Sequence, residues 1–202
     1  MINEKYQAER IRLAKLNAEN EGDREHPVFG EGNSQSPVIM FIGEAPGREE
    51  AECGRPFVGR AGKQLDRMLE LAEIDRQAVF VTNTVKYRPT KTSNGRTSNR
   101  TPTSDEIREG LALLRYEIAA VRPRVIATLG NVPLSAVAML ADESLEPVKV
   151  GAAHGVQMGL MIDGVHYIAF PLYHPAASIY NRALKPVLED DLVRLGELCR
   201  SL

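Results

Sequence analysis

Short apolar runs alternate along the chain with segments whose apolar positions recur every three or four residues. The runs at 38–43, 78–83 and 124–130 are rich in apolar residues, which is typical of strands buried on both faces of a sheet. Helical spacing between and beyond these runs predicts helices at 4–18, 61–72, 103–121, 132–140 and 186–202. This alternation predicts an α/β fold with a mainly parallel sheet.

Capping and turn residues sharpen these boundaries. The run TSDE (103–106) is a capping box that begins one helix, and Pro123 ends that helix. The dipeptide Asp-Gly at 163–164 divides the apolar stretch 155–174, which predicts two strands joined as a hairpin. The segment 84–102, rich in Thr, Asn, Pro and basic residues, is predicted to be a loop.

The predicted helices cover both faces of the sheet, so the expected fold class is a three-layer α/β sandwich. We find no internal repeat and no linker, which predicts a single domain over 1–202. In such sheets, sites lie at the carboxyl ends of the strands. That edge collects the loops 43–60, 83–102 and 173–182.

The net charge of −2 argues against a generally basic nucleic-acid binder, but the charges are unevenly distributed. No acidic residue occurs from 76 to 104 or from 164 to 188, and both stretches carry Lys and Arg. Two interpretations follow. Either one face of the protein meets a polyanion, or these stretches are solvated loops whose charge has no role.

No apolar run approaches the length of about 18 residues that spans a membrane, and the charged N-terminal segment has no signal-peptide pattern. We therefore expect a cytoplasmic protein without a membrane partner. Its two cysteines, Cys53 and Cys199, are too few for a disulfide framework or a four-thiolate metal site. We expect two unpaired thiols.

The stretch GEAPGREEAECGRPFVGRAG (43–62) has the glycine content of a phosphate-binding loop. A Walker loop requires Ser or Thr after its Gly-Lys pair, but Gln64 follows Gly62 and Lys63 here, so nucleotide triphosphatase chemistry is not supported. Signatures of serine hydrolases and zinc enzymes are missing too. The glutamates beyond the first strand end are expected to be a solvated face: Glu49, Glu50 and Glu52.

Asn83 follows a buried strand directly, where an amide costs desolvation energy unless it is paired. One possible use is to cap a turn. The other is to read a flat heterocycle, because one fixed amide can donate to O4 of uracil and accept from N3–H. Cytosine presents the reverse pattern at these atoms.

Two further side chains at this edge carry candidate chemistry. Phe57, within the glycine-rich loop, either offers a ring face to a base or packs into the core. His174, at the end of the last apolar strand, either has a structural role or donates to a developing oxyanion as a neutral imidazole. The other three histidines are expected to be structural or solvated: His26, His154 and His166.

Taken together, these residues resemble the uracil-DNA glycosylase superfamily, most closely its family 4 enzymes of bacteria and archaea. The resemblance covers nearly the whole chain. It rests on motifs in a specific order, namely VFGEGN (28–33), GEAPG (43–47), GRPFVGRAGKQL (54–65), VFVTNTVKYRP (79–89), the PT..EI segment (102–107), PRVIATLG (123–130) and HPAA (174–177). It implies the three-layer fold of that superfamily.

The resemblance also implies a monofunctional enzyme that flips uracil out of duplex or single-stranded DNA and hydrolyses its N-glycosidic bond. Glu44 and the amides of Gly43 to Ala45 would line the sugar–base junction and hold the hydrolytic water. His174 would stabilise charge on uracil O2. The alternatives are a glycosylase for another deaminated base, such as hypoxanthine, and a DNA-binding relative without catalysis.

By the same resemblance, Phe57 would stack on the flipped base and Asn83 would read its edge. Ile179 or Tyr180 would enter the duplex as a wedge. The basic residues of the acid-free stretches suit phosphate contacts, and we assign to DNA binding Lys91, Arg96, Arg100 and Arg182. We expect the protein to act as a monomer.

The chain departs from family 4 where those enzymes hold an iron–sulfur cluster on four cysteines. Tyr87 stands at one ligand position, Gly110 or a neighbour at another, and no cysteine precedes Cys53. We therefore predict no cofactor and no metal, because such a cluster needs those thiolates, and we expect Tyr87 to fill the space. The loop 91–100 also lacks the histidine with which one branch traps the abasic sugar.

Overall fold

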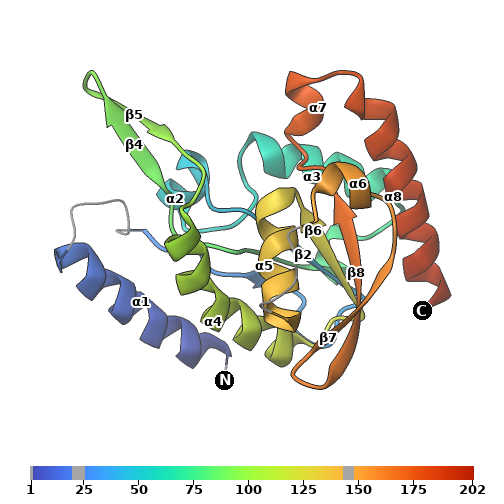
Figure 1. The fold of residues 1–202 in the computed structure, drawn as a ribbon, viewed down its shortest axis with the longest axis horizontal. Coiled ribbons are helices and arrows are strands. Elements are labelled where there is room, and N and C mark those ends of the chain that lie inside the picture. The colour runs from blue at the N-terminus through green and yellow to red at the C-terminus, as the bar shows by residue number, and fades with distance from the viewer. Residues whose placement is uncertain (1, 20–25, 143–147) are drawn as a thin grey trace.

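A six-stranded sheet forms the centre of the computed structural model, which describes residues 2–19, 26–142 and 148–202, with only the backbone described at 17–19 and 179. The strand order is β1-β3-β2-β6-β8-β7; the four central strands are parallel, and β1 and β7 pair antiparallel at the two edges (Figure 1). The strands are β1 (Glu31–Gly32), β2 (Ile39–Gly43), β3 (Phe80–Asn83), β6 (Val125–Leu129), β7 (Met158–Ile162) and β8 (Val165–Leu172).

Helices cover both faces of this sheet. One face packs against α3 and α8, the other against α4 and α5, and α1 lies outside α4 (Figure 1). These helices are α1 (Ile2–Glu19), α3 (Arg60–Leu71), α4 (Ser104–Val121), α5 (Asn131–Ala141) and α8 (Leu184–Ser201). The arrangement confirms the predicted three-layer α/β sandwich with a mainly parallel sheet.

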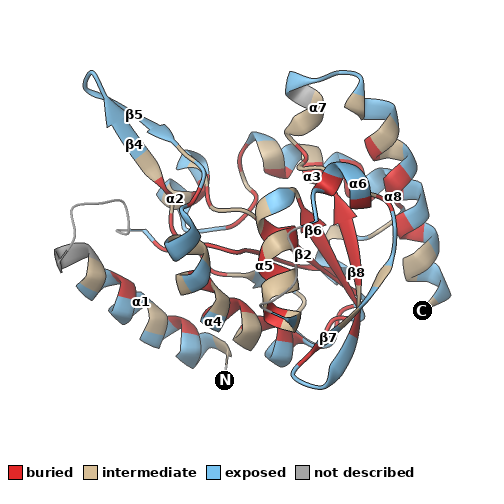
Figure 2. Ribbon diagram, in the orientation of Figure 1, coloured by how far each residue is buried: buried red, intermediate tan, exposed pale blue. Residues whose placement is uncertain are grey.

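The apolar runs become strands because side chains alternate between the two faces of a strand. In β2, Ile39 and Phe41 belong to the core under α3 and α8, whereas Met40 and Ile42 belong to the core under α4 and α5. All five residues of this strand are buried (Figure 2). A strand that supplies two cores must be apolar throughout, which is why the pattern predicted it correctly.

The capping box and the hairpin were also predicted correctly. Thr103 accepts from the amide of Glu106 at 3.3 Å, and the Glu106 carboxylate accepts from the amide of Thr103 at 2.8 Å. The β7–β8 hairpin turns at Asp163 and Gly164, whose φ angles of 51° and 75° are those of a type I′ turn. None of the helices in the described parts of the chain is long and apolar enough to cross a membrane.

The prediction of a loop over 84–102 was wrong, because this segment contains the two-stranded hairpin β4 (Thr90–Ser93) and β5 (Arg96–Asn99). Its turn is Asn94-Gly95, with φ angles of 49° and 71°. The hairpin projects from the body of the molecule and is exposed along almost its whole length, so no alternation of apolar residues marked it (Figure 2).

Four short helical segments were not predicted either. They span only three to six residues each, too few to show a periodic pattern. They are α2 (Arg48–Cys53), the 3₁₀ helix η1 (Arg76–Ala78), α6 (Val150–Ala153) and α7 (Ala177–Tyr180). Two of them, α2 and α7, flank the candidate site.

Candidate active site

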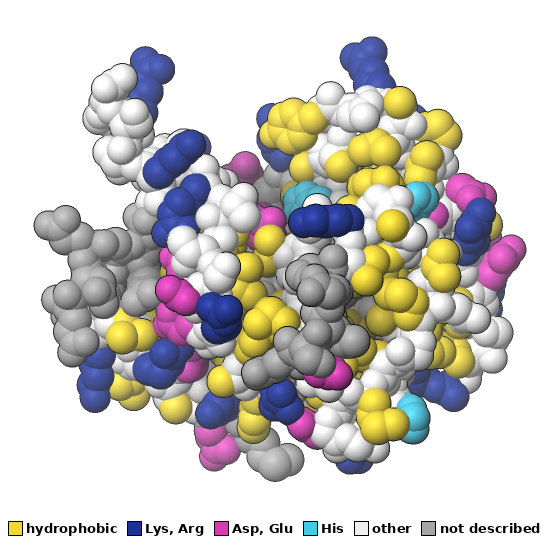
Figure 3. All heavy atoms as spheres, viewed as in Figure 1, with side chains coloured by type: hydrophobic (Ala, Val, Ile, Leu, Met, Phe, Trp, Pro, Cys, Tyr) yellow, Lys and Arg dark blue, Asp and Glu magenta, His cyan; other side chains and the backbone are white. Residues whose placement is uncertain are grey.

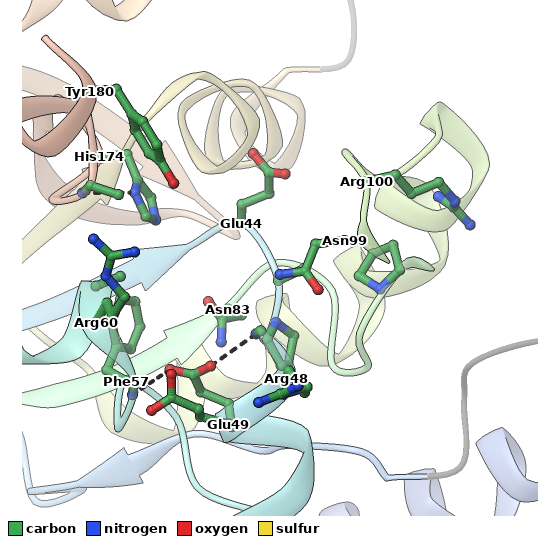
Figure 4. Close-up of a pocket in the computed structure, with 18 residues that line it drawn as sticks. Glu44, Arg48, Glu49, Phe57, Arg60, Asn83, Asn99, Arg100, His174 and Tyr180 are labelled. Atoms are coloured by element: carbon green, nitrogen blue, oxygen red, sulfur yellow. Dashed lines mark hydrogen bonds between the residues drawn. The ribbon is translucent and has the colours of Figure 1, made fainter. Parts of the chain in front are cut away.

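The three loops expected at the carboxyl edge of the sheet meet around one pocket of about 420 Å³ (Figure 4). In the sheet, Gly43 at the end of β2 pairs with Asn83 at the end of β3, which brings the first two loops together. The third loop follows β8 and contributes His174, Ala176 and Tyr180 to the wall. The volume is in the range of small-molecule sites.

At the inner end of the pocket, Gly43, Phe57 and Asn83 are packed tightly together. A methyl group on Gly43 would lie 2.4 Å from the Asn83 Oδ1 atom and 2.6 Å from the Phe57 Cζ atom. Both distances are shorter than real Cβ contacts, so only glycine lets the amide and the ring approach each other this closely.

The backbone of Phe57 is held in a strained conformation. Its φ of 55° is in the left-handed region, which an aromatic residue rarely adopts. Gly62, in the first turn of α3, packs so closely on Phe57 that an added Cβ would lie 1.8 Å from the Phe57 carbonyl oxygen. The ring is buried, with one part in the core under α3 and another lining the pocket. The two interpretations of Phe57 are thus compatible.

Asn83 is only 4% exposed, yet its side chain lines the pocket. Its amide forms no hydrogen bond with a side chain or backbone group of the described residues. Neither the amide oxygen nor the amide nitrogen is fully buried without a partner, so both atoms stay accessible. The amide therefore does not cap a turn within the described chain. Its donor and acceptor remain available to a molecule in the pocket.

His174 presents a defined tautomer to the pocket. Its Nδ1 atom accepts from the amide of Ala176 at 3.2 Å, so in the neutral ring the proton is on Nε2. Burial lowers the pKa of His174, although the charge of Glu50 opposes this shift. A neutral imidazole with a free Nε2–H donor can stabilise negative charge on a ligand oxygen.

Glu44 follows β2 directly and is half-buried in the pocket wall. Burial raises the pKa of this carboxyl above its ordinary value, because desolvation disfavours the charged form. The site thus combines a carboxylate, a neutral imidazole and an amide, all at strand ends (Figure 4).

One glutamate in the first loop differs from the expectation of a solvated face. Glu50 is buried, and its carboxylate accepts from the amide of Gly59 at 2.8 Å and from the amide of Gly47 at 3.1 Å. These bonds join the two ends of the loop around α2. Glu49 and Glu52 are exposed as expected.

The sequence analysis missed three polar side chains that line the pocket: Arg48, Arg60 and Asn99 (Figure 4). Asn99 is the last residue of the β4–β5 hairpin, and its Oδ1 atom accepts from Arg88 Nε at 2.6 Å. The two arginines are separated in sequence from the basic stretches, and Arg48 precedes two glutamates, so charge patterning did not single them out.

The predicted phosphate-contacting residues lie in different settings. Lys91 and Arg96 are exposed on the hairpin, where Lys and Arg side chains gather (Figure 3). Arg100 instead anchors the hairpin to α4, since its NH1 and NH2 atoms lie 2.6 and 2.8 Å from the two Glu106 carboxylate oxygens. Its assignment to DNA binding remains a prediction.

On the other side of the pocket, Tyr180 is 84% exposed at the end of α7. Arg182 is also exposed and lines a separate groove between α3 and α8. The side chain of Ile179, the other predicted wedge, lies outside the described residues. Tyr180 and the hairpin residue Asn99 thus line the pocket from opposite sides (Figure 4).

The residues present do not fit an iron–sulfur cluster. The chain has only two cysteines; Cys53 is exposed, Cys199 lies on α8, and both are free. Tyr87 is buried in an apolar cluster with Leu13 and Val85, which joins α1 to the start of the second loop. No group of three or more His, Cys, Asp or Glu side chains suited to a metal occurs in the described part of the chain.

Comparison with known families agrees with this geometry. The model of the uracil DNA glycosylase superfamily matches residues 29–193, which include all three loops of the pocket. The chain therefore belongs to the uracil DNA glycosylase superfamily.

Its relatives within the superfamily include the type-4 uracil-DNA glycosylase of Saccharolobus solfataricus, 40% identical over 88% of this chain and 78% of the relative. The type-4 enzyme of Thermotoga maritima is 36% identical over 83% of this chain and 81% of the relative. A type-5 uracil-DNA glycosylase of Pyrobaculum aerophilum is 27% identical over 77% of this chain and 67% of the relative. The chain is thus more similar to these two type-4 enzymes than to this type-5 enzyme.

Proposed function

We infer that the protein removes uracil from DNA by hydrolysing the N-glycosidic bond. Membership in the uracil DNA glycosylase superfamily and the similarity to type-4 uracil-DNA glycosylases support this activity. The observation that carries the assignment of residues is the pocket itself. It brings the unpaired amide of Asn83, the neutral imidazole of His174 and the carboxyl of Glu44 to one edge of the sheet.

Recognition begins with extrusion of the nucleotide, because a base inside a duplex cannot reach the pocket; this unstacking costs roughly a few kcal/mol. The flipped base stacks on the ring of Phe57. Its edge pairs with Asn83, which donates from Nδ2 to uracil O4 and accepts at Oδ1 from N3–H. Cytosine reverses both donor and acceptor and is refused.

Cleavage moves the electron pair of the C1′–N1 bond onto the base, and negative charge develops on uracil O2. The Nε2–H group of His174 donates to this oxygen. Positive charge develops on the sugar, where the Glu44 carboxylate stabilises it and orients a water. The water oxygen bonds to C1′, and its proton is lost to Glu44 or to the departing uracil anion.

Contacts with the phosphates hold the DNA over the pocket. Lys91 and Arg96 are exposed on the hairpin, and Arg182 is exposed beside a separate groove between α3 and α8. Tyr180 would fill the space that the flipped base vacates. These contacts position the strand and carry no sequence information.

The direct test uses oligonucleotides that carry a single uracil, hypoxanthine or thymine mismatch. The protein is incubated with each, and abasic sites are then cleaved with alkali. We expect scission at uracil only, and none without alkali, since no lysine is among the described residues that line the pocket. Preferred cleavage at hypoxanthine would show that this base, and not uracil, is the substrate. Binding without scission on any of the oligonucleotides would identify an inert DNA-binding protein.

A further inference from the structure

A buried network of charged and polar side chains lies directly behind Asn83, outside the pocket. The side chains of Lys86 and Glu117 are 2% and 0% exposed, and the Lys86 Nζ atom lies 2.7 Å from the Glu117 Oε2 atom. Lys86 belongs to the acid-free segment 76–104, but its charge is compensated inside the protein and does not face a polyanion. The proposed reaction assigns no role to this pair.

Every proton of the Lys86 ammonium group has an acceptor. Besides Glu117, Nζ donates to Thr82 Oγ1 at 2.8 Å and to the backbone carbonyl of Asn83. Thr82 Oγ1 in turn donates to Glu117 Oε2 at 2.9 Å. Three hydrogen bonds of the network therefore involve Thr82 or Asn83, the last two residues of β3.

The network also reaches helix α1. The hydroxyl group of Tyr6 donates to the Glu117 Oε1 atom at 2.8 Å, and its ring stacks on Phe29 with centroids 4.6 Å apart. Burial, reinforced by the charge of Glu117, raises the pKa of Tyr6 above its ordinary range, so the phenol stays a neutral donor. Helix α1 is thereby connected to the end of β3.

Stability alone is a weak reason for such a pair. Burying two opposite charges costs desolvation energy that their attraction repays only in part, and neutral residues of similar volume often stabilise a protein equally well. Fixing a geometry is a better reason here. Asn83 is the last residue of its strand, and its side chain makes no hydrogen bond within the described chain that would hold it.

We propose that Lys86 and Glu117 are positioning residues that fix the backbone of Asn83, and with it the direction of the amide that reads uracil. The inference rests on the proposed function. Tyr6 connects this hydrogen-bond network to α1, so the packing of the N-terminal helix contributes to base recognition. Neither charged residue touches the substrate, and both act through Asn83.

The test replaces the pair together, as Lys86→Met with Glu117→Gln, so that no single charge is left buried. Misplacing the Asn83 amide can lower the rate by up to about a hundredfold. Single-turnover excision of uracil should therefore slow by about tenfold to a hundredfold. The substrate 4-thiouracil gives a second readout, because sulfur at position 4 is a weak acceptor. The preference for uracil over 4-thiouracil should shrink by about threefold or more.

A matched control is Asp191→Asn, which alters another carboxylate contact away from the pocket, the partly buried hydrogen bond of 2.8 Å between Asp191 Oδ2 and His154 Nδ1. This variant should lower the melting temperature and leave the preference between the two bases unchanged. A purely structural role of Lys86 and Glu117 predicts the same pattern for the double variant. That result, in a folded double variant, would overturn the inference.

If the double variant does not fold, Thr82→Val serves instead, because it removes the hydroxyl that both charged residues contact and keeps a similar shape. Wild-type rate and preference in this variant would also overturn the proposal. Failure of the proposed function is a different result, since the wild-type protein itself would then release no uracil.

Discussion

The inner end of the pocket and its rim are built in opposite ways. At the inner end, Gly43, Phe57 and Asn83 pack so closely that one added methyl group would clash with two of them. At the rim, the hairpin is exposed and Tyr180 is 84% exposed. Tight packing fixes atoms to within a fraction of an ångström, as reading a base requires. Exposed basic side chains attract phosphate without such precision. We therefore assign recognition of the base to the inner end and attraction of the DNA backbone to the rim.

Removal of the Asn83 amide should have the largest effect. Asn83→Ala deletes both hydrogen bonds to the base and should lower kcat/KM on uracil-containing DNA by roughly 10²–10³-fold, as loss of one active-site donor does. Single-turnover kinetics with a labelled oligonucleotide measure this. Full activity would refute the reading role of Asn83.

Gly43→Ala tests the packing of the inner end without removing a polar group. The new methyl group must displace the Asn83 amide, the Phe57 ring or both. Overpacking of this kind costs about 1–3 kcal/mol, and a misplaced amide slows excision by up to about a hundredfold. Calorimetry and single-turnover rates report the two effects. A variant with wild-type rate would show that the inner end adapts.

The pH dependence of the reaction tests Glu44. Its pKa is raised by burial, so the carboxylate is present above that pKa and is lost as the pH falls through it. Hence kcat/KM should fall on the acid side at a pH above that of an ordinary carboxyl group. Glu44→Gln should react more slowly and lose this acid limb. An unchanged limb in Glu44→Gln would assign it to another group.

Changes at the rim should affect binding and leave the chemical step unchanged. Lys91→Ala with Arg96→Ala removes two exposed charges, so the slope of log K against log salt concentration should flatten by about 2. Fluorescence anisotropy at several salt concentrations measures the slope. An unchanged slope would remove the hairpin from the DNA interface.

Treatment with an iron chelator should have no effect on stability or on activity. The residues around Tyr87 offer no thiolates, so chelation should alter neither the melting temperature nor the rate. The purified protein should be colourless. A stoichiometric iron content that falls together with stability on chelation would contradict this.

The polar pocket residues at strand ends were predictable from the sequence, because they follow buried strands. Asn83 and Glu44 stand at the ends of apolar runs, and parallel strands bring such ends to one edge. Glu50 was not predictable in the same way. A carboxylate among glycines looks solvated until the fold brings the amides of Gly47 and Gly59 to it.

The rim and the supporting network lacked a local signal. The hairpin is polar on both faces, so no alternation of apolar residues marked its strands, and Asn99 was taken for part of a loop. Lys86 appeared as one of several basic residues. Its partner Glu117 lies 31 positions further along the chain, on a helix, and only the fold brings the two together.

The division between inner end and rim is tested most directly by single-turnover rates at saturating protein, where binding no longer limits excision. Asn83→Ala and the Lys91→Ala, Arg96→Ala double variant are compared with the wild-type protein on one uracil-containing oligonucleotide. The proposed function predicts that the Asn83 variant stays slower by roughly 10²-fold or more at saturation. It predicts that the hairpin variant reaches the wild-type rate. Equal losses in both variants, or none in the Asn83 variant, would contradict it.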